Sequence, residues 1–202
     1  MKKFTKYILF ISLGLLCSCS DYLDIVPDNV TTLDIVFNNK NTAQRYLANC
    51  YHFVPDHGSV KRIPGMGAGH ECWFYTDKDS YFDNEVSFYI ARGLQNTNAP
   101  YANYWDGEGG SKLPMFRAIR ECNIFLSYVR DQHKVNDLTD SERKRWIAEV
   151  NVLKAYYHFF LFEHYGPIPI VDEALPVSTS SEGVKVTRMP VDQVVDFMVK
   201  LI

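Results

Sequence analysis

The residues best suited to chemistry lie between positions 71 and 105, where aromatic rings alternate with amide, acidic and basic side chains. Flat rings can cover the apolar face of a sugar, and polar side chains can hydrogen-bond its hydroxyl groups. This mixture favours carbohydrate binding. The side chains that we expect to contact such a ligand are Trp73, Tyr75, Asp77, Tyr81, Arg92, Asn96 and Asn98.

Each of these rings has a second interpretation, because aromatic side chains in a long loop region can also build that region's own core. Trp73, Tyr75 and Tyr81 are our first choices for ligand contact, since their charged neighbours indicate exposure. Trp105 lies ahead of the helix predicted to begin at Leu113, which favours a structural role for this ring.

Catalytic motifs are missing from the sequence, which has no Gly-rich phosphate loop, Gly-x-Ser-x-Gly elbow or His-Glu-x-x-His pair. The acidic stretch 77–85 fails the spacing of an EF-hand, because Tyr81 and Phe82 stand where a ligand and the turn glycine belong. His57 and His70 lack further ligands at metal-site spacing. We therefore expect no metal, no cofactor and no covalent chemistry.

The first 18 residues are predicted to be a lipoprotein signal peptide. A basic start is followed by a mainly apolar run of ten residues, Tyr7 to Leu16, which is too short to span a bilayer. The segment Leu16-Cys17-Ser18-Cys19 resembles a bacterial lipobox, which makes Cys19 the lipid-bearing first residue of the mature chain. Ordinary secretion with an unmodified Cys19 is the alternative.

The charge of the mature chain excludes one class of partner. Removal of the signal peptide leaves 18 of the 21 basic residues against all 24 acidic ones, a formal net charge of −6. Without a basic run, the chain is not expected to bind nucleic acid. Residues 19–40 are predicted to be an acidic surface tether and N-terminal segment.

The stretch from Lys154 to Val171 organises the remaining elements. Between Tyr156 and Phe162 six of seven residues are apolar or aromatic, and a helix that is apolar nearly all round must be surrounded by other elements. Gly166 and Pro167 are typical of a helix end, so residues 168–171 should leave as an extended segment.

The same helix should begin after Thr139, which can form a capping box with Glu142. The charged side chains expected to make its first half solvated are Arg143, Lys144, Arg145 and Glu149.

Three other helices are predicted from apolar residues at helical spacing. The first runs from Thr42 to about Phe53 with Asn41 as its cap, the second begins at Leu113 with Asn123 buried and hydrogen-bonded, and the last begins at Pro190. Positions 55–110 form a long ordered loop region with one short helix, and such loops are usually functional.

Three cysteines follow position 19, an odd number that excludes a complete disulfide framework. Cys50 and Cys122 fall on apolar helical faces, which predicts buried free thiols, whereas Cys72 falls in the loop region.

The central stretch resembles the signature of the SusD/RagB-like family, surface lipoproteins that hand glycans to a TonB-dependent outer-membrane transporter. Lys154 replaces the usual arginine of that signature and His158 its third tyrosine. The segment Phe116–Leu126 also resembles the family. The matching residues of the signature are Ala155, Tyr156, Tyr157, Phe159, Tyr165, Gly166 and Pro169.

The resemblance implies a mainly α-helical, tetratricopeptide-like superhelix with long inserted ligand-binding loops. The sequence has no clean 34-residue period, so the repeat rests on the resemblance alone. Residues 41–202 would form the N-terminal helical domain, and we expect the C-terminal portion to be absent, because family members are longer and the last helix stops in mid-pattern.

The function implied is that of a lipid-anchored, surface-exposed protein of the outer membrane, which binds an oligosaccharide and delivers it to a TonB-dependent transporter. A lipoprotein helical scaffold that binds only protein partners is the first alternative, and a truncated, non-functional fragment is another. A glycosidase is the weakest, because only Glu71 with Asp77 or Asp79 offers a carboxylate pair and nothing specific supports it.

Labelling with a fatty-acid analogue should mark the wild-type protein but not the Cys19→Ala variant, because the lipobox cysteine is the acyl acceptor. The measurement is the incorporated label on the purified protein. Equal labelling of the two proteins would contradict the lipoprotein prediction.

Overall fold

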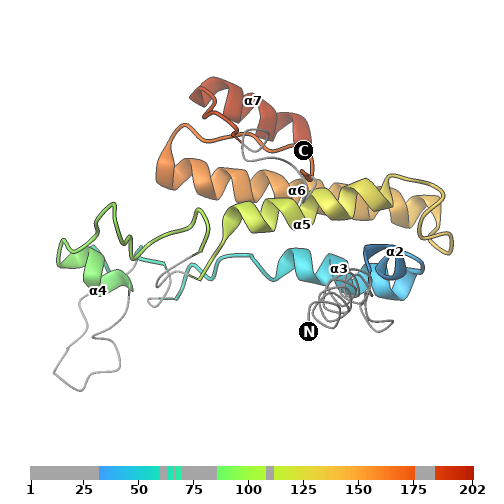
Figure 1. Ribbon diagram of the computed structural model, residues 1–202, viewed down its shortest axis with the longest axis horizontal. Coiled ribbons are helices and arrows are strands. Elements are labelled where there is room, and N and C mark those ends of the chain that lie inside the picture. The colour runs from blue at the N-terminus through green and yellow to red at the C-terminus, as the bar shows by residue number, and fades with distance from the viewer. Residues whose placement is uncertain (1–31, 60–62, 66, 70–85, 108–111, 176–184) are drawn as a thin grey trace, which may run out of the picture. The chain divides into compact units, whose positions relative to one another are not determined.

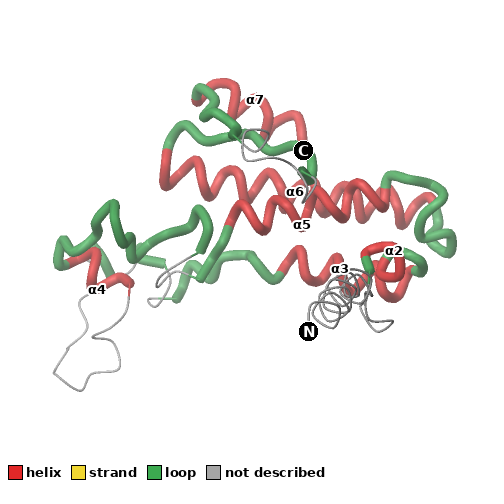
Figure 2. Tube along the Cα trace, viewed as in Figure 1, coloured by secondary structure: helices red, strands yellow, loops and turns green. Residues whose placement is uncertain are grey.

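The computed structural model describes residues 32–59, 63–65, 67–69, 86–107, 112–175 and 185–202. Every regular element within them is an α-helix, which confirms the predicted fold class (Figures 1 and 2). The tetratricopeptide-like repeat stays a prediction. The helices are α2 (Leu33–Val36), α3 (Lys40–Tyr51), α4 (Val86–Ala91), α5 (Met115–Val129), α6 (Asp140–Tyr165) and α7 (Val191–Leu201).

The chain divides into two compact units, residues 1–35 and 36–202, and helices α3 to α7 all belong to the second. None of the described helices combines the length and the apolar character that crossing a bilayer would need.

Helix α6 is the centre of the second unit. Helix α5 lies along it (Figure 1), and α3 and α7 also pack against it. Tyr157, Phe160 and Leu161 are almost completely buried, so the predicted surrounding of this helix is confirmed. One narrow face stays open, where Val152 and Phe159 are 50% and 47% exposed.

Both ends of α6 follow the sequence prediction. The Thr139 hydroxyl accepts a hydrogen bond from the Glu142 backbone N–H at 3.3 Å, and the Glu142 carboxylate accepts one from the Thr139 N–H at 3.2 Å. Gly166 ends the helix with φ +68°, a conformation that costs a residue without a Cβ little.

The prediction that the first half of α6 is solvated is wrong for Arg143, which is buried. Lys144 and Arg145 are exposed, but Arg143 is only 8% exposed and donates hydrogen bonds of 2.6 to 3.1 Å to backbone carbonyl groups. Carbonyl groups at and beyond a helix end lack intrahelical partners, and a guanidinium group with five N–H donors satisfies several together. The acceptors lie at the end of α5 and beyond it, in Val129, Asp131, Lys134 and Val135.

The start of α3 also differs from the prediction. The cap is Asn39, whose side chain accepts from the Thr42 backbone N–H at 3.1 Å, and not Asn41. Asparagine is a favoured cap residue, so the residue type alone does not predict whether Asn39 or Asn41 caps the helix. The choice follows from tertiary contacts of Lys40, whose backbone N–H donates to the Asp137 carboxylate at 2.7 Å.

Lys154 is completely buried and connects α6 to the extended segment that follows it. Its ammonium group donates to the Asp172 carbonyl oxygen at 2.8 Å and forms an ion pair with the Asp172 carboxylate. Burial lowers the pKa of Lys154, while the contacts with Asp172 oppose that shift. The ion pair therefore holds the extended segment after Gly166 against α6.

Other predicted core residues lie where the sequence placed them. Cys50 and Cys122 are buried free thiols on α3 and α5, and Cys72 lies outside the described residues. The Asn123 amide nitrogen donates to the Val171 carbonyl at 3.0 Å, whereas its buried amide oxygen has no partner among the described residues.

Phe160→Ala should lower the free energy of unfolding by about 3–5 kcal/mol, because truncation of a buried aromatic ring leaves a cavity. The matched control is Phe159→Ala on the same helix, which should cost less than about 1 kcal/mol since its ring is half exposed. Urea denaturation measures both values. Similar losses in the two variants would contradict the central position of the buried face.

Candidate functional site

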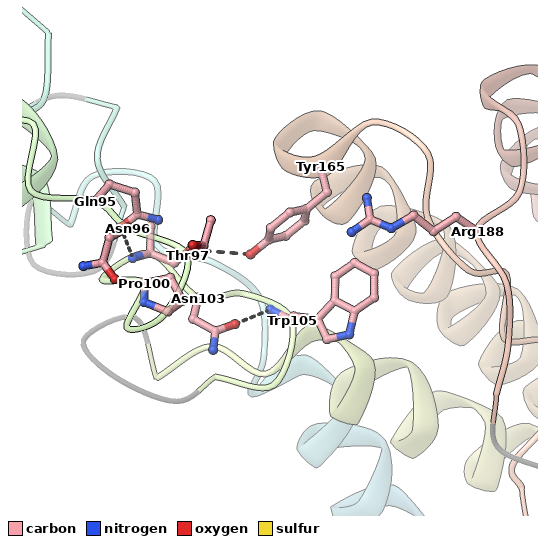
Figure 3. A pocket seen from close by; sticks show the side chains of 9 residues that line it. Gln95, Asn96, Thr97, Pro100, Asn103, Trp105, Tyr165 and Arg188 are labelled. Carbon is pink, nitrogen blue, oxygen red and sulfur yellow. Dashed lines mark hydrogen bonds between the residues drawn. The ribbon is translucent and has the colours of Figure 1, made fainter. Parts of the chain in front are cut away.

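A cavity of about 470 Å³ opens beside the C-terminal end of α6 (Figure 3). Three segments of the chain form it: the loop after α4, the last residue of α6, and the residues just before α7. The lining residues are Gln95, Asn96, Thr97, Pro100, Ala102, Asn103, Trp105, Tyr165 and Arg188.

Side-chain amides shape the loop side of the cavity. The Gln95 amide oxygen accepts hydrogen bonds from the backbone N–H groups of Tyr101 and Ala102, at 2.8 and 3.3 Å. The Asn96 amide oxygen accepts from Asn98 and Ala99, at 3.1 and 2.7 Å. Amide side chains of this kind hold turns by replacing backbone acceptors.

Asn103 orients the residue that follows the turn. Its amide oxygen accepts from the Trp105 backbone N–H at 3.1 Å, and its amide nitrogen donates to the Asp106 carboxylate at 2.5 Å. Two residues before Asn103, Tyr101 stacks on Tyr89 of α4 with ring centroids 4.1 Å apart. Residues 101–106 of the loop are therefore held by specific contacts.

Tyr165 joins this loop to the end of α6. Its hydroxyl group accepts from the Tyr104 backbone N–H at 2.9 Å and faces the Ala102 carbonyl oxygen at 3.4 Å. Burial raises the pKa of Tyr165, so its hydroxyl stays neutral at physiological pH. A neutral hydroxyl can donate to one partner while it accepts from the other.

Trp105 is half-buried and is one of two aromatic residues that line the cavity. Its ring packs edge-to-face with Phe116 and Tyr165, at centroid distances of 4.7 and 5.5 Å. The Arg188 guanidinium carbon lies 5.0 Å from the Trp105 ring centroid, and Arg188 also donates to the Pro167 carbonyl at 3.2 Å. In Figure 3 the guanidinium group lies beside both aromatic rings.

The structure places only part of the predicted ligand-binding set. Asn96 lines the cavity, whereas Asn98 lies in the adjoining turn and Arg92 directly follows α4. Their contact with a ligand stays a prediction. The same holds for four residues that lie outside the described part of the chain: Trp73, Tyr75, Asp77 and Tyr81.

Of the nine lining residues the sequence prediction included only Asn96, and the eight that it left out include Tyr165, Trp105 and Arg188. Tyr165 belongs to the family-like signature, so a signal for it was present. Trp105 was predicted to be structural, and its packing on Phe116 agrees with that role while its remaining surface lines the cavity. Arg188 gave no local signal, because only the return of the chain after α6 brings it to Trp105.

The two histidines of α6 form hydrogen bonds within their own helix. His158 and His164 each donate from Nδ1 to the carbonyl oxygen one turn earlier, at 2.7 Å. Burial lowers the pKa of His158 to about 4, so this side chain is neutral at physiological pH. Among the described residues, no three His, Cys, Asp or Glu side chains gather as a metal ion would require.

Tyr165→Phe should lower the free energy of unfolding by about 1–3 kcal/mol, because the Tyr104 N–H loses its acceptor. Tyr51→Phe is the control, since Tyr51 lies 44% exposed on α3 and should tolerate the loss of its hydroxyl. Urea denaturation of both variants tests the role of Tyr165. An unchanged unfolding midpoint for Tyr165→Phe would show that this hydroxyl does not hold the loop.

Comparison with known proteins gives one family. The model of a SusD-like family, described as starch-binding and associating with the outer membrane, matches residues 21–201. No protein of curated function matches the chain.

Solved structures share the fold. A SusD-like protein from Bacteroides fragilis NCTC 9343 has a TM-score of 0.58 at 15% sequence identity, over 83% of this chain and 29% of that protein. A protein named BT4246 has a TM-score of 0.59 at 24% identity, over 81% of this chain and 25% of that protein. This chain thus spans less than a third of either protein. By its match over residues 21–201, the chain belongs to the SusD-like family, as its sequence signature predicted.

Proposed function

We propose that this protein binds glycans at the outer membrane and passes them to a TonB-dependent transporter without covalent chemistry. The observation that carries the proposal is the cavity at the end of α6, which joins aromatic ring surface to polar side chains. The description of the family as starch-binding and outer-membrane-associated supports the same function.

The cavity offers both kinds of contact that a sugar needs. Trp105 and Tyr165 provide apolar ring surface, and Gln95, Asn96 and Arg188 provide hydrogen-bonding groups around it. Sugars bury modest apolar area on one ring face and keep their hydroxyl groups hydrogen-bonded. A lining of this composition suits such a ligand better than a purely apolar molecule.

The cavity is proposed as one part of a larger binding surface. Trp73, Tyr75, Asp77 and Tyr81 remain our proposed contacts outside the described residues, with Trp73 as a second stacking platform. Arg92 and Asn98 are exposed on the same loop region as the cavity and can extend the polar contacts.

The lipid anchor and the transporter partner are inferred from the sequence alone. Lipid on Cys19 would hold the protein to the membrane, and residues 19–40 would separate the binding domain from it. The TonB-dependent transporter follows from the family resemblance. Co-purification of such a transporter with the protein from detergent-solubilised outer membranes tests this partner, and its consistent absence would contradict the delivery step.

Trp105→Ala should weaken glycan binding about tenfold, because loss of one stacked ring removes about 1–2 kcal/mol of apolar contact. Calorimetric titration with a panel of oligosaccharides measures the dissociation constants and shows whether the sugar stays intact. Tyr51→Ala is the control, since it removes an exposed ring that does not line the cavity.

Two outcomes would contradict this assignment. Equal affinity of wild type and Trp105→Ala would place the site elsewhere, and cleavage of the sugar would indicate a glycosidase. Trp73→Ala, Tyr75→Ala and Tyr81→Ala belong in the same titrations, where unchanged affinity in all three would assign these rings to the core of the loop region.

A further inference from the structure

The lining of the cavity carries a single formal charge, which is positive. Among its nine residues Arg188 is the charged one, and no aspartate or glutamate takes part. The nearby Asp106 lies outside the lining, where its carboxylate accepts a hydrogen bond from Asn103. The lining itself is therefore formally cationic, while Asp106 acts on Tyr165 from outside it and the chain after position 18 is acidic as a whole.

The hydrogen-bonding groups of the lining are also asymmetric. The amide oxygens of Gln95, Asn96 and Asn103 already accept hydrogen bonds from the backbone of their own loop. The Gln95 amide nitrogen and the Trp105 indole nitrogen have no acceptor among the described residues, so both remain available as donors. A ligand would thus meet donors more often than acceptors, which favours a ligand rich in oxygen acceptors.

Arg188 is held in place while part of its guanidinium group stays available. One terminal nitrogen donates to Pro167, and the carbon lies over the Trp105 ring. In the described part of the chain no carboxylate forms an ion pair with Arg188. Its other N–H groups can therefore pair with an anion, and guanidinium groups pair with planar carboxylates through two parallel hydrogen bonds.

Arg188 places its positive charge next to the aromatic rings of the cavity. The guanidinium group lies beside Trp105 and Tyr165 (Figure 3), so one sugar unit can contact a ring and the cation together. A neutral sugar would leave the exposed guanidinium group without a charged partner in the lining. An anionic substituent on the sugar supplies such a partner.

We propose that the cavity selects an acidic glycan, whose carboxylate or sulfate group pairs with Arg188 while Trp105 and Tyr165 contact the sugar ring. The inference rests on the proposed glycan binding and adds the class of sugar.

A matched pair of ligands tests this charge preference. Oligogalacturonate and its methyl ester share one backbone and differ in the charge of the carboxyl groups, and calorimetric titration at low salt compares them. The acid should bind at least about tenfold more tightly than the ester, since hydrogen bonds to charged groups are stronger than neutral ones. A sulfated oligogalactan and its desulfated form separate sulfate from carboxylate as the preferred group.

Variants of Arg188 test whether this residue causes the preference for acidic sugars. Arg188→Gln should remove most of the difference between acid and ester, and Arg188→Lys should restore part of it by keeping the charge without the planar fork. Lys185→Gln is the control, because it removes one positive charge from the same segment outside the lining. A circular dichroism melt of each variant checks that the fold is intact.

The outcomes separate this inference from the proposed function. If acid and ester, and the sulfated and desulfated forms, bind equally well, or if Arg188→Gln leaves a charge preference unchanged, the inference is wrong while glycan binding stands. If no oligosaccharide, acidic or neutral, binds at all, glycan binding itself is contradicted and the inference with it.

Discussion

The burial of α6 is the constraint on which the rest of the structure depends. A helix that carries Tyr157, Phe160 and Leu161 on one face cannot be left in water, because each exposed large apolar side chain would forgo about 1.5–3 kcal/mol. Helices α3, α5 and α7 cover most of this surface. The buried Lys154 then uses its charge to hold the extended segment after the helix.

The candidate site is a consequence of how α6 ends. Gly166 turns the chain directly after Tyr165, whose hydroxyl group reaches the loop that follows α4. The return of the chain toward α7 then brings Arg188 over Trp105. The cavity thus combines a helix end with a loop whose turns are held by its own amide side chains, and the Arg188 guanidinium carbon lies 5.0 Å from the Trp105 ring centroid.

Local signals carried most of the fold prediction. The capping box of Thr139, the glycine at the end of α6 and the apolar stripe of α5 act within a few residues, so the sequence reveals them directly. Arg143 was wrongly predicted to be solvated and Asn41 was wrongly predicted to be the cap of α3, because tertiary contacts decide both features. The cavity was even harder to predict from the sequence, because its lining joins segments up to 93 positions apart, from Gln95 to Arg188.

The most direct test of glycan binding in this cavity uses the three tryptophans of the chain, at positions 73, 105 and 146. Their indole N–H resonances can be assigned by single Trp→Phe variants and followed during titration with an oligosaccharide. The Trp105 resonance should shift in a saturable manner, while that of the buried Trp146 stays unchanged. A Trp105 resonance that does not move at saturating oligosaccharide would contradict the account.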